Sequence, residues 1–590
     1  MGRSSQQRDV THRLPTRSGQ PVDNEEKRRK EKEHLYKRSK EMKRNKTASQ
    51  HNFAIIPKTD VPRSRFLMKQ TRKQAFNASE LVPIMCEEVL PGDTWQHTES
   101  IMARLSTPIA PAVDDIDLET WYFFVPNRLT WKGTGAKTKW EEFITGEDTA
   151  LAVPTITPWS TANAYTVELG GVFDHFGLPL GTYSTNALQV NAMPIFAYFL
   201  IYNEWFRDQN LQEPWEWALT WTNSTSETIT QGATAWEQQC LRVNKRSDYF
   251  TRSLPWPQKG DAVSIPLGTE APVYVDSSIS TGNSVAVTVE GTTTHRQVVS
   301  QAAGSGTTWG AASASGQTPQ LYADLSAATA ATINSLRLAM ATQQLLEKDA
   351  RGGTRYVESL LVHWGTRSPD FRLQRPEYLG GSKIPVTVNP IAQTAEYDDG
   401  SGAAPLALGN LGAEMHASGH KRSFTYAATE HGYIIGVCAL RATPTYQQGV
   451  RRHWRRETRL DFAWPTLANL GEQAVATQEI YQPLNNTPTY TTWGYQERNA
   501  EYRYTPNEIT GVMRSTAPTP LDWWHYAEEF SAEPALNAAF ITDKTQETLA
   551  RSLATQTSEN WSAQVIMDIL HTSNVARLLP AYADPGLHRF

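Results

Sequence analysis

The chain has 590 residues, of which 39% are hydrophobic and 20% charged, and its formal net charge is -5. Three cysteines, Cys86, Cys240 and Cys438, stand far apart and in no CxxC spacing, which argues against a disulfide framework and a thiolate zinc site and favours a reducing compartment. No apolar run approaches the roughly 18 residues that a membrane-spanning helix needs, and the N-terminus carries no apolar leader. We therefore expect a soluble protein with no membrane span, made inside a cell.

The charge is unevenly distributed along the chain. Residues 1–50 contain 15 Lys or Arg against 7 Asp or Glu, whereas residues 51–590 contain 41 Lys or Arg against 54 Asp or Glu. The densest run, residues 27–46, carries 11 Lys or Arg against 3 Glu. Such a segment has too little apolar surface to compensate its ordering entropy, so we expect residues 1–52 to form a basic arm that is disordered or transiently helical in isolation. Its natural partner is a polyanion, and a merely solvated tail is the alternative.

The arm supplies the first group of residues predicted to contact nucleic acid. These are Lys27, Arg28, Arg29, Lys30, Lys37, Arg38, Lys43 and Arg44.

Strand patterns recur once order begins, which we expect near Phe53. Residues 121–125 (WYFFV) are aromatic and β-branched and are stopped by Pro126. Residues 383–388 (KIPVTV) and 433–440 (YIIGVCAL) show the same pattern. These segments predict β-strands.

Two segments are instead predicted to be helical. The first is residues 192–209 and the second is residues 326–349, with Ser326 as N-cap and Gly352 followed by Gly353 as the stop. The apolar stripe of the second helix consists of Ile333, Leu336, Met340 and Leu345.

Short strands separated by very long loops with inserted helices argue against alternating βα units. They predict a mainly β protein, a jelly roll or antiparallel β-sandwich over residues 53–590. Residues 268–325 are rich in Ser, Thr, Gly and Ala and contain an alternating run, SVAVTV at 284–289. We interpret residues 268–325 as a projecting, hairpin-like insertion, with a flexible linker as the alternative.

Motifs for catalysis or metal binding are weak. Residues 133–138 (GTGAKT) lack the spacing of a phosphate-binding loop. Glu414, His416 and His420 could hold a metal only on a helix, and the glycines and serine around them indicate a loop with surface histidines. We therefore assign no catalytic residue, metal ligand or cofactor. A glycosidase stays open by composition alone, without identifiable paired carboxylates.

A second cationic cluster lies inside the chain, at residues 451–459 (RRHWRRETR). Guanidinium groups beside an indole can pair with phosphates and stack on unpaired bases. Ion pairs with the acidic body are an equal alternative. The members predicted to contact DNA are Arg451, Arg452, Trp454, Arg455 and Arg456.

Several long blocks resemble the major capsid protein of the Microviridae, of the gokushovirus type. The resemblance spans roughly residues 53–590. The longest blocks are WYFFVPNR (121–128), YNEWFRDQNL (202–211), DYFTRSLPWPQKG (248–260), LLEKDARGGTRY (345–356), SPDFRLQRPEYLGG (368–381), EHGYIIG (430–436) and GYQERNAEYRY (494–504).

The resemblance implies a single viral jelly-roll subunit without enzymatic activity, which assembles into a small icosahedral shell around circular single-stranded DNA. It implies a virion protein made in the cytoplasm of a bacterial host, with minor virion proteins and the host cell surface as further partners. We assign the surface protrusion of such shells to residues 268–325, with residues 211–244 as second choice. The basic arm is longer than the family pattern leads us to expect.

A shell subunit also buries aromatic side chains against its neighbours. Candidates for subunit interfaces are Trp205, Phe206, Trp256, Trp364, Trp464 and Tyr495, although large rings are more often ordinary core. A module that binds single-stranded nucleic acid or carbohydrate is the alternative function, and it predicts a monomer or small oligomer rather than large particles.

Overall fold

The computed structural model divides the chain into two units, residues 1–62 and 63–590, and each is described by itself. In the first unit, residues 29–33 are helical and exposed. The residues that the structure describes are 29–33, 63–132, 137–157, 165–183, 190–215, 226–230, 239–261, 263, 273–275, 285–288, 295–299, 308–312, 321–323, 333–394, 409, 411–483, 491–554 and 563–582. The expected onset of order near Phe53 lies outside them.

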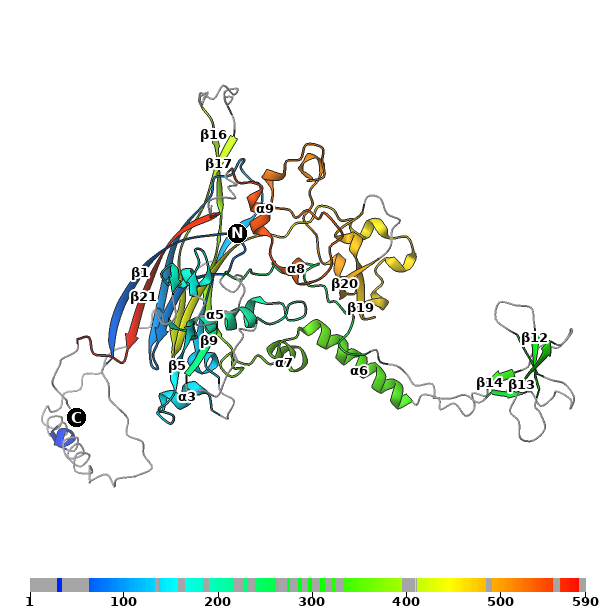
Figure 1. Ribbon diagram of the computed structural model, residues 1–590, viewed down its shortest axis with the longest axis horizontal. Helices are drawn as coiled ribbons and strands as arrows, with labels where there is room; N and C mark the ends of the chain where they lie inside the picture. The colour runs from blue at the N-terminus through cyan, green and yellow to red at the C-terminus, as the bar shows by residue number, and fades with distance from the viewer. Residues whose placement is uncertain are drawn as a thin grey trace, which may run out of the picture. The chain divides into compact units, whose positions relative to one another are not determined.

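Two antiparallel sheets form the framework of the second unit, and Figure 1 shows β1 and β21 side by side in one of them. The five-stranded sheet has the order β1 (Ser64–Phe76), β21 (Val565–Arg577), β3 (Thr94–Leu105), β17 (Leu411–Ala427) and β16 (Thr387–Ala392). The four-stranded sheet has the order β15 (Glu377–Pro385), β4 (Ile116–Pro126), β18 (Gly432–Ala442) and β2 (Val82–Val89).

The pairing of these strands is nested. In chain order the long strands are β1, β2, β3, β4, β15, β17, β18 and β21, and the first pairs with the last, the second with the seventh, the third with the sixth and the fourth with the fifth. All four pairs are antiparallel. Nested pairs split over two sheets are the topology of a jelly roll, so the predicted fold class is confirmed.

The two sheets differ in how they are covered. Side chains of β21 alternate between buried and exposed along most of the strand, as expected where one face of a sheet meets the core and the other meets solvent. In β18 nearly every residue is buried, since helices of an insertion pack against the outer side of its sheet. This double burial explains the continuous apolar run at 433–440.

A polar cluster lies inside the sandwich core. His97 Nδ1 lies 2.8 Å from the Ser573 hydroxyl, His571 Nε2 lies 3.0 Å from the Ile84 carbonyl oxygen, and the two rings approach within 3.3 Å. Burial lowers the pKa of His97 to about 3 and that of His571 to about 4. Both imidazoles are therefore neutral in the folded chain at neutral pH.

A long insertion, residues 127–376, connects β4 to β15. Its helices are α2 (Asn127–Thr130), α3 (Lys139–Ile144), α4 (Val172–Phe176), α5 (Met193–Ile201), a π-helical turn η1 (Tyr202–Phe206), α6 (Ile333–Gly352) and α7 (Tyr356–Trp364). Its short strands are β5 (Ala152–Thr157), β6 (Tyr165–Val167), β7 (Gly181–Tyr183), β8 (Val190–Asn191), β9 (Ser226–Thr230), β10 (Val273–Val275), β11 (Val285–Thr288), β12 (His295–Val299), β13 (Thr308–Ala312) and β14 (Leu321–Ala323).

Both predicted helices are present with shifted ends. The first is α5 continued by η1, so it stops at Phe206. The second is α6, which ends at Gly352 before Gly353 takes a φ of +89°, as the glycine pair predicts. The predicted N-cap Ser326 lies outside the described residues.

The strand prediction at 383–388 was wrong in one respect. The segment is divided at Val386, between β15 in one sheet and β16 in the other. The Val386 N–H donates to the Ile116 carbonyl at 2.9 Å. The chain changes sheet there, which one continuous strand could not do.

Within residues 268–325 the described segments pair as strands. β11 pairs antiparallel with β12, β12 with β13, and β10 with β14. The second candidate insertion, 211–244, runs into the main core, where Leu241 and Val243 are buried.

The second insertion, residues 443–564, connects β18 to β21. It contains β19 (Glu472–Ala476), β20 (Thr492–Glu497), α8 (Ala538–Ile541), α9 (Thr545–Ala550) and the 3-10 turns η3 (Arg452–Arg455), η4 (Arg459–Asp461), η5 (Pro465–Leu467), η6 (Thr477–Glu479), η7 (Ala500–Tyr502), η8 (Gly511–Met513) and η9 (Asp522–Trp524). A small second core joins the two insertions, with Tyr249 and Phe250 from the first against Val475 and Trp493 from the second.

Candidate assembly and nucleic-acid surfaces

The basic arm is described only in one helical turn. Arg29 and Lys30 belong to that turn and are exposed. The other arm residues predicted to contact DNA lie outside the described residues: Lys27, Arg28, Lys37, Arg38, Lys43 and Arg44.

The arginine cluster (residues 451–459) forms two 3-10 turns at the start of the second insertion. Arg451 pairs with Glu508 at 2.5 Å. Arg452 lies 3.3 Å from Glu479, whose side chain is almost wholly buried. These contacts neutralise part of the cluster's positive charge within the same chain.

A shared carboxylate completes this network. Glu501 lies 3.3 Å from Arg456 and 3.7 Å from Arg452. Burial raises the pKa of the neighbouring Glu479 carboxyl, while Arg452 acts against that rise. The ion-pair alternative thus accounts for three of the arginines, and their predicted contact with DNA stays a prediction.

The aromatic member of the cluster has a different environment. Trp454 is 76% exposed and its ring lies 5.0 Å from that of His453. A cavity of about 220 Å³ lies beside the cluster, between Arg452, Arg456 and the stacked rings of Tyr249 and Tyr504. An exposed indole next to guanidinium groups remains able to stack on an unpaired base.

The six interface candidates fall into two groups. Trp205 and Phe206 pack on the main core, where the Trp205 indole donates to the Pro376 carbonyl at 3.0 Å and Phe206 meets Trp121 edge to face. Both rings are half-buried and pack against the core, and their predicted role at a subunit interface stays a prediction.

Of the remaining four candidates, one is exposed and three are half-buried like the first two. Trp364 is 70% exposed, whereas Trp256, Trp464 and Tyr495 are half-buried. The indole of Trp464 donates to the Arg459 carbonyl at 2.9 Å. Trp364 is the candidate that a neighbouring subunit could cover most extensively.

The metal interpretation of Glu414, His416 and His420 required a helix, and the expected alternative was a loop. Both are wrong, because all three lie in β17. The His420 ring lies 2.7 Å from the Ser100 hydroxyl. Among the described residues, no group of three or more His, Cys, Asp or Glu side chains is arranged to hold a metal ion.

Exposed apolar side chains occur on α6, α7 and the turns after them; of these elements, only the helix at 326–349 was predicted from the sequence. The exposed side chains are Leu338, Met340, Leu345, Tyr356, Leu361, Val362, Trp364 and Phe371. Contiguous exposed apolar surface marks an interaction site. Of the exposed apolar residues on α6, Met340 and Leu345 belong to the predicted stripe, whereas Leu338 does not.

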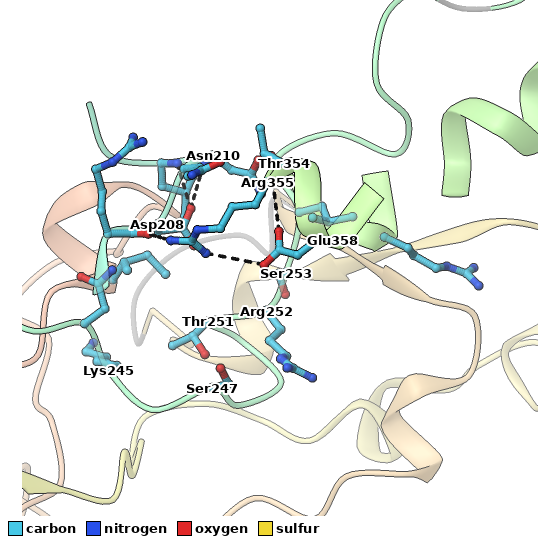
Figure 2. Close-up of a pocket in the computed structure, with 18 of the residues that line it drawn as sticks. Asp208, Asn210, Lys245, Ser247, Thr251, Arg252, Ser253, Thr354, Arg355 and Glu358 are labelled. Carbon is cyan, nitrogen blue, oxygen red and sulfur yellow. Dashed lines mark hydrogen bonds and ion pairs between the residues drawn. The ribbon is translucent and has the colours of Figure 1, made fainter. Parts of the chain in front are cut away.

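A polar cavity of about 720 Å³ lies between the two insertions (Figure 2). Its wall includes Arg355, which donates to the Arg207 carbonyl at 2.6 Å and lies 3.6 Å from Glu358. The Asp208 carboxylate accepts from the Asn210 backbone N–H at 2.8 Å. Hydrogen-bonding groups and guanidinium groups line this cavity, so it could hold a polar, negatively charged group.

Comparison with known proteins gives the family. The capsid protein (F protein) family matches residues 54–587. Capsid protein VP1 of Bdellovibrio phage phiMH2K is 42% identical over 522 residues, covering 85% of this chain and 92% of the relative. VP1 of Chlamydia phage 1 is 37% identical and VP1 of Spiroplasma virus 4 is 33% identical, each covering 91% of this chain and 98% of the relative.

This chain belongs to the capsid protein (F protein) family. Its resemblance to the major capsid proteins of the Microviridae is confirmed, and the chain is a structural capsid protein rather than an enzyme. Membership implies that it assembles with copies of itself into a capsid and is a component of the virion. In the described part of the chain, no helix has the length and apolar character to cross a membrane.

Proposed function

We propose that this chain is the major subunit of a small icosahedral shell that encloses circular single-stranded DNA and is made in the cytoplasm of a bacterial host. The observation that carries the proposal is the distribution of charge. Residues 27–46 hold 11 Lys or Arg against 3 Glu, on a chain whose net charge is -5. Minor virion proteins share the shell with it.

The arm acts by neutralising the genome. Facing the interior, its cations pair with phosphates and release condensed counterions, which gives binding that depends on salt and not on sequence. Trp454 and the arginine cluster add a site where an unpaired base can stack.

Two deletions test the arm with a matched control. Residues 1–26 contain 4 Lys or Arg against 4 Asp or Glu, so their deletion removes no net charge, whereas deletion of 27–46 removes 11 Lys or Arg and 3 Glu, a net charge of +8. We expect DNA per particle to fall when 27–46 are deleted and to stay at the full-chain value when 1–26 are deleted. Unchanged DNA content and particle yield after deletion of 27–46 would refute the proposal.

A different outcome would reassign the arm. Loss of all particles after deletion of 27–46, under conditions where the full chain forms shells without DNA, would place the arm beneath a neighbouring subunit. The DNA content of purified shells, measured by absorbance ratio, separates the two roles.

The insertion at 268–325 is proposed to contact the host cell surface. Paired short strands, β11 with β12 and β12 with β13, support a folded protrusion rather than a linker. Replacing 268–325 by a short Gly-Ser linker should leave particles that form but no longer adsorb to host cells. Adsorption at the full-chain level would contradict this role.

A further inference from the structure

Helix α6 exposes a stripe of residues with the spacing of a coiled coil. Asn334, Leu338, Ala341, Leu345 and Lys348 are all exposed and follow one another at intervals of four, three, four and three residues. This is a repeat of 3.5, which keeps one seam of a helix facing a partner helix along its length. Leu338 is 68% exposed and Leu345 is 50% exposed.

The C-terminal end of α6 is held by its own chain. Ala350, on the face opposite the stripe, is buried, and Arg351 pairs with Glu472 at 2.5 Å. Asp349, beside the stripe, lies 2.7 Å from the His363 ring on α7. These contacts fix the rotation of the helix about its axis, with the buried Ala350 turned away from the stripe.

An exposed leucine seam needs a partner. Most of the stability of a helix in a protein comes from packing of its apolar face, and burial of that face is what the free subunit lacks here. Of the possible occupants, a second copy of this chain fits best, because the family is one of self-assembling capsid proteins.

The seam is also compatible with itself. Ala341 is small and lies between two leucines, so leucine side chains of a facing helix can insert beside it. Arg337 and Gln344 flank one side of the seam and Thr342 and Asp349 the other, so a parallel pairing places Arg337 opposite Thr342 and Gln344 opposite Asp349. No like charges oppose each other along these flanks, and Lys348, which faces its counterpart at the C-terminal end of the stripe, can extend its ammonium group into solvent.

We propose that the seam of Leu338, Ala341 and Leu345 on α6 packs against the same seam of neighbouring copies and joins subunits in the shell. This inference rests on the proposed function and names one surface that performs the assembly. It extends the role of the long insertion from surface protrusion to subunit contact.

Cysteine cross-linking tests the contact directly. Cys240 and Cys438 are buried and Cys86 is half-buried, so an introduced thiol on α6 is the accessible one among the described residues. Ala341→Cys should give a disulfide-linked dimer band when purified particles are mildly oxidised. Ala339→Cys, on the anchored face, should stay monomeric. A monomeric Ala341→Cys in intact particles would overturn the inference.

A pair of charge substitutions tests the energetics. Leu338→Glu lies in the seam, whereas Ile144→Glu changes an exposed apolar side chain on α3, outside the α6 and α7 surface; Ile144 is 48% exposed. We expect the particle yield of Leu338→Glu to fall at least tenfold, while that of Ile144→Glu stays within twofold of the unsubstituted chain. Equal yields for the two variants would overturn the inference.

The failure of this inference and that of the proposed function are distinguishable. If Leu338→Glu forms shells that contain DNA at the normal yield, the proposed α6 contact is refuted and the proposed function is not affected. Absence of any shell from the unsubstituted chain would remove the proposed function itself.

Discussion

Two helices of the same insertion, α5 and α6, show how one chain separates contacts within a copy from contacts between copies. Seven of the nine residues of α5 are buried, and Tyr198 donates from its hydroxyl to the Leu81 carbonyl at 2.8 Å. Helix α6 is longer, yet Leu338, Met340 and Leu345 are exposed. Apolar content alone therefore does not separate core from interface. The position of each helix relative to the two sheets makes the difference.

The largest expected loss of folding stability comes from a substitution in α5. Tyr198 is fully buried, and its hydroxyl also accepts from the Leu241 backbone N–H at 3.0 Å. Tyr198→Ala leaves a cavity and unpaired backbone groups, and should lower the free energy of unfolding by about 3–5 kcal/mol. Urea unfolding of the isolated subunit measures it. A loss below about 1 kcal/mol would show that α5 is not part of the core.

The next largest expected effect is a loss of folding stability at acid pH, caused by the buried histidines. The pKa of His571 is lowered to about 4 in the folded chain, against about 6.5 when unfolded, so the unfolded state binds more protons between these values. Stability should be fully present above about pH 6.5 and fall toward pH 4, by up to about 3 kcal/mol for this group.

A comparison of variants isolates this contribution. Burial raises the pKa of carboxyls such as Asp543, and a raised carboxyl pKa makes folding stability increase toward acid pH. The dependence of folding stability on pH is therefore measured for each variant and compared with that of the unsubstituted chain. His571→Gln should reduce the loss of folding stability toward acid pH, whereas Thr572→Val on the same strand, which removes no titratable group, should leave that loss unchanged. Identical slopes for all three chains would rule out the buried imidazole as the cause.

A smaller effect is expected in the arginine cluster. Arg452→Ala leaves the buried Glu479 without its guanidinium partner, which should cost about 1–3 kcal/mol of folding stability. Glu479→Gln in the same chain should recover part of the loss. A double-mutant cycle by thermal unfolding gives the interaction energy between Arg452 and Glu479. An interaction energy near zero would mean that Arg452 does not stabilise the fold through Glu479, which would favour its predicted contact with DNA.

The smallest effect should come from α6. Leu338→Ala removes a side chain that is 68% exposed in the isolated subunit, so the free energy of unfolding should change by less than about 0.5 kcal/mol. Tyr198→Ala in α5 should therefore destabilise the isolated subunit by several kcal/mol more than Leu338→Ala in α6 does. Destabilisation by several kcal/mol with Leu338→Ala would mean that Leu338 is packed within one copy.

Much of the framework could be predicted from the sequence, because the inner sheet strands are buried on both faces. The runs at 121–125 and 433–440 are continuous and apolar, so they indicate β4 and β18 directly. Strand β17 was taken for a loop because its outer face carries polar residues and Gly419. A Cβ at Gly419 would come within 2.6 Å of the Ile384 side chain, so the glycine allows close packing rather than a turn.

The candidate surfaces were less predictable, since they depend on residues distant in the chain. The cationic run at 451–459 was evident, but nothing near it indicated that Glu479, Glu501 and Glu508 would pair with its arginines. Likewise helix α6 was predicted, but the predicted apolar stripe shares only Leu345 with the exposed seam, whose orientation depends on anchoring by Glu472 and His363. Partners that lie far apart in sequence leave no local pattern.

The most direct test of the account is the size of the purified full chain under assembly conditions, by sedimentation with negative-stain imaging. The account predicts closed icosahedral particles with this chain as their principal component. A population that stays monomeric or as small oligomers under all conditions tried would contradict it.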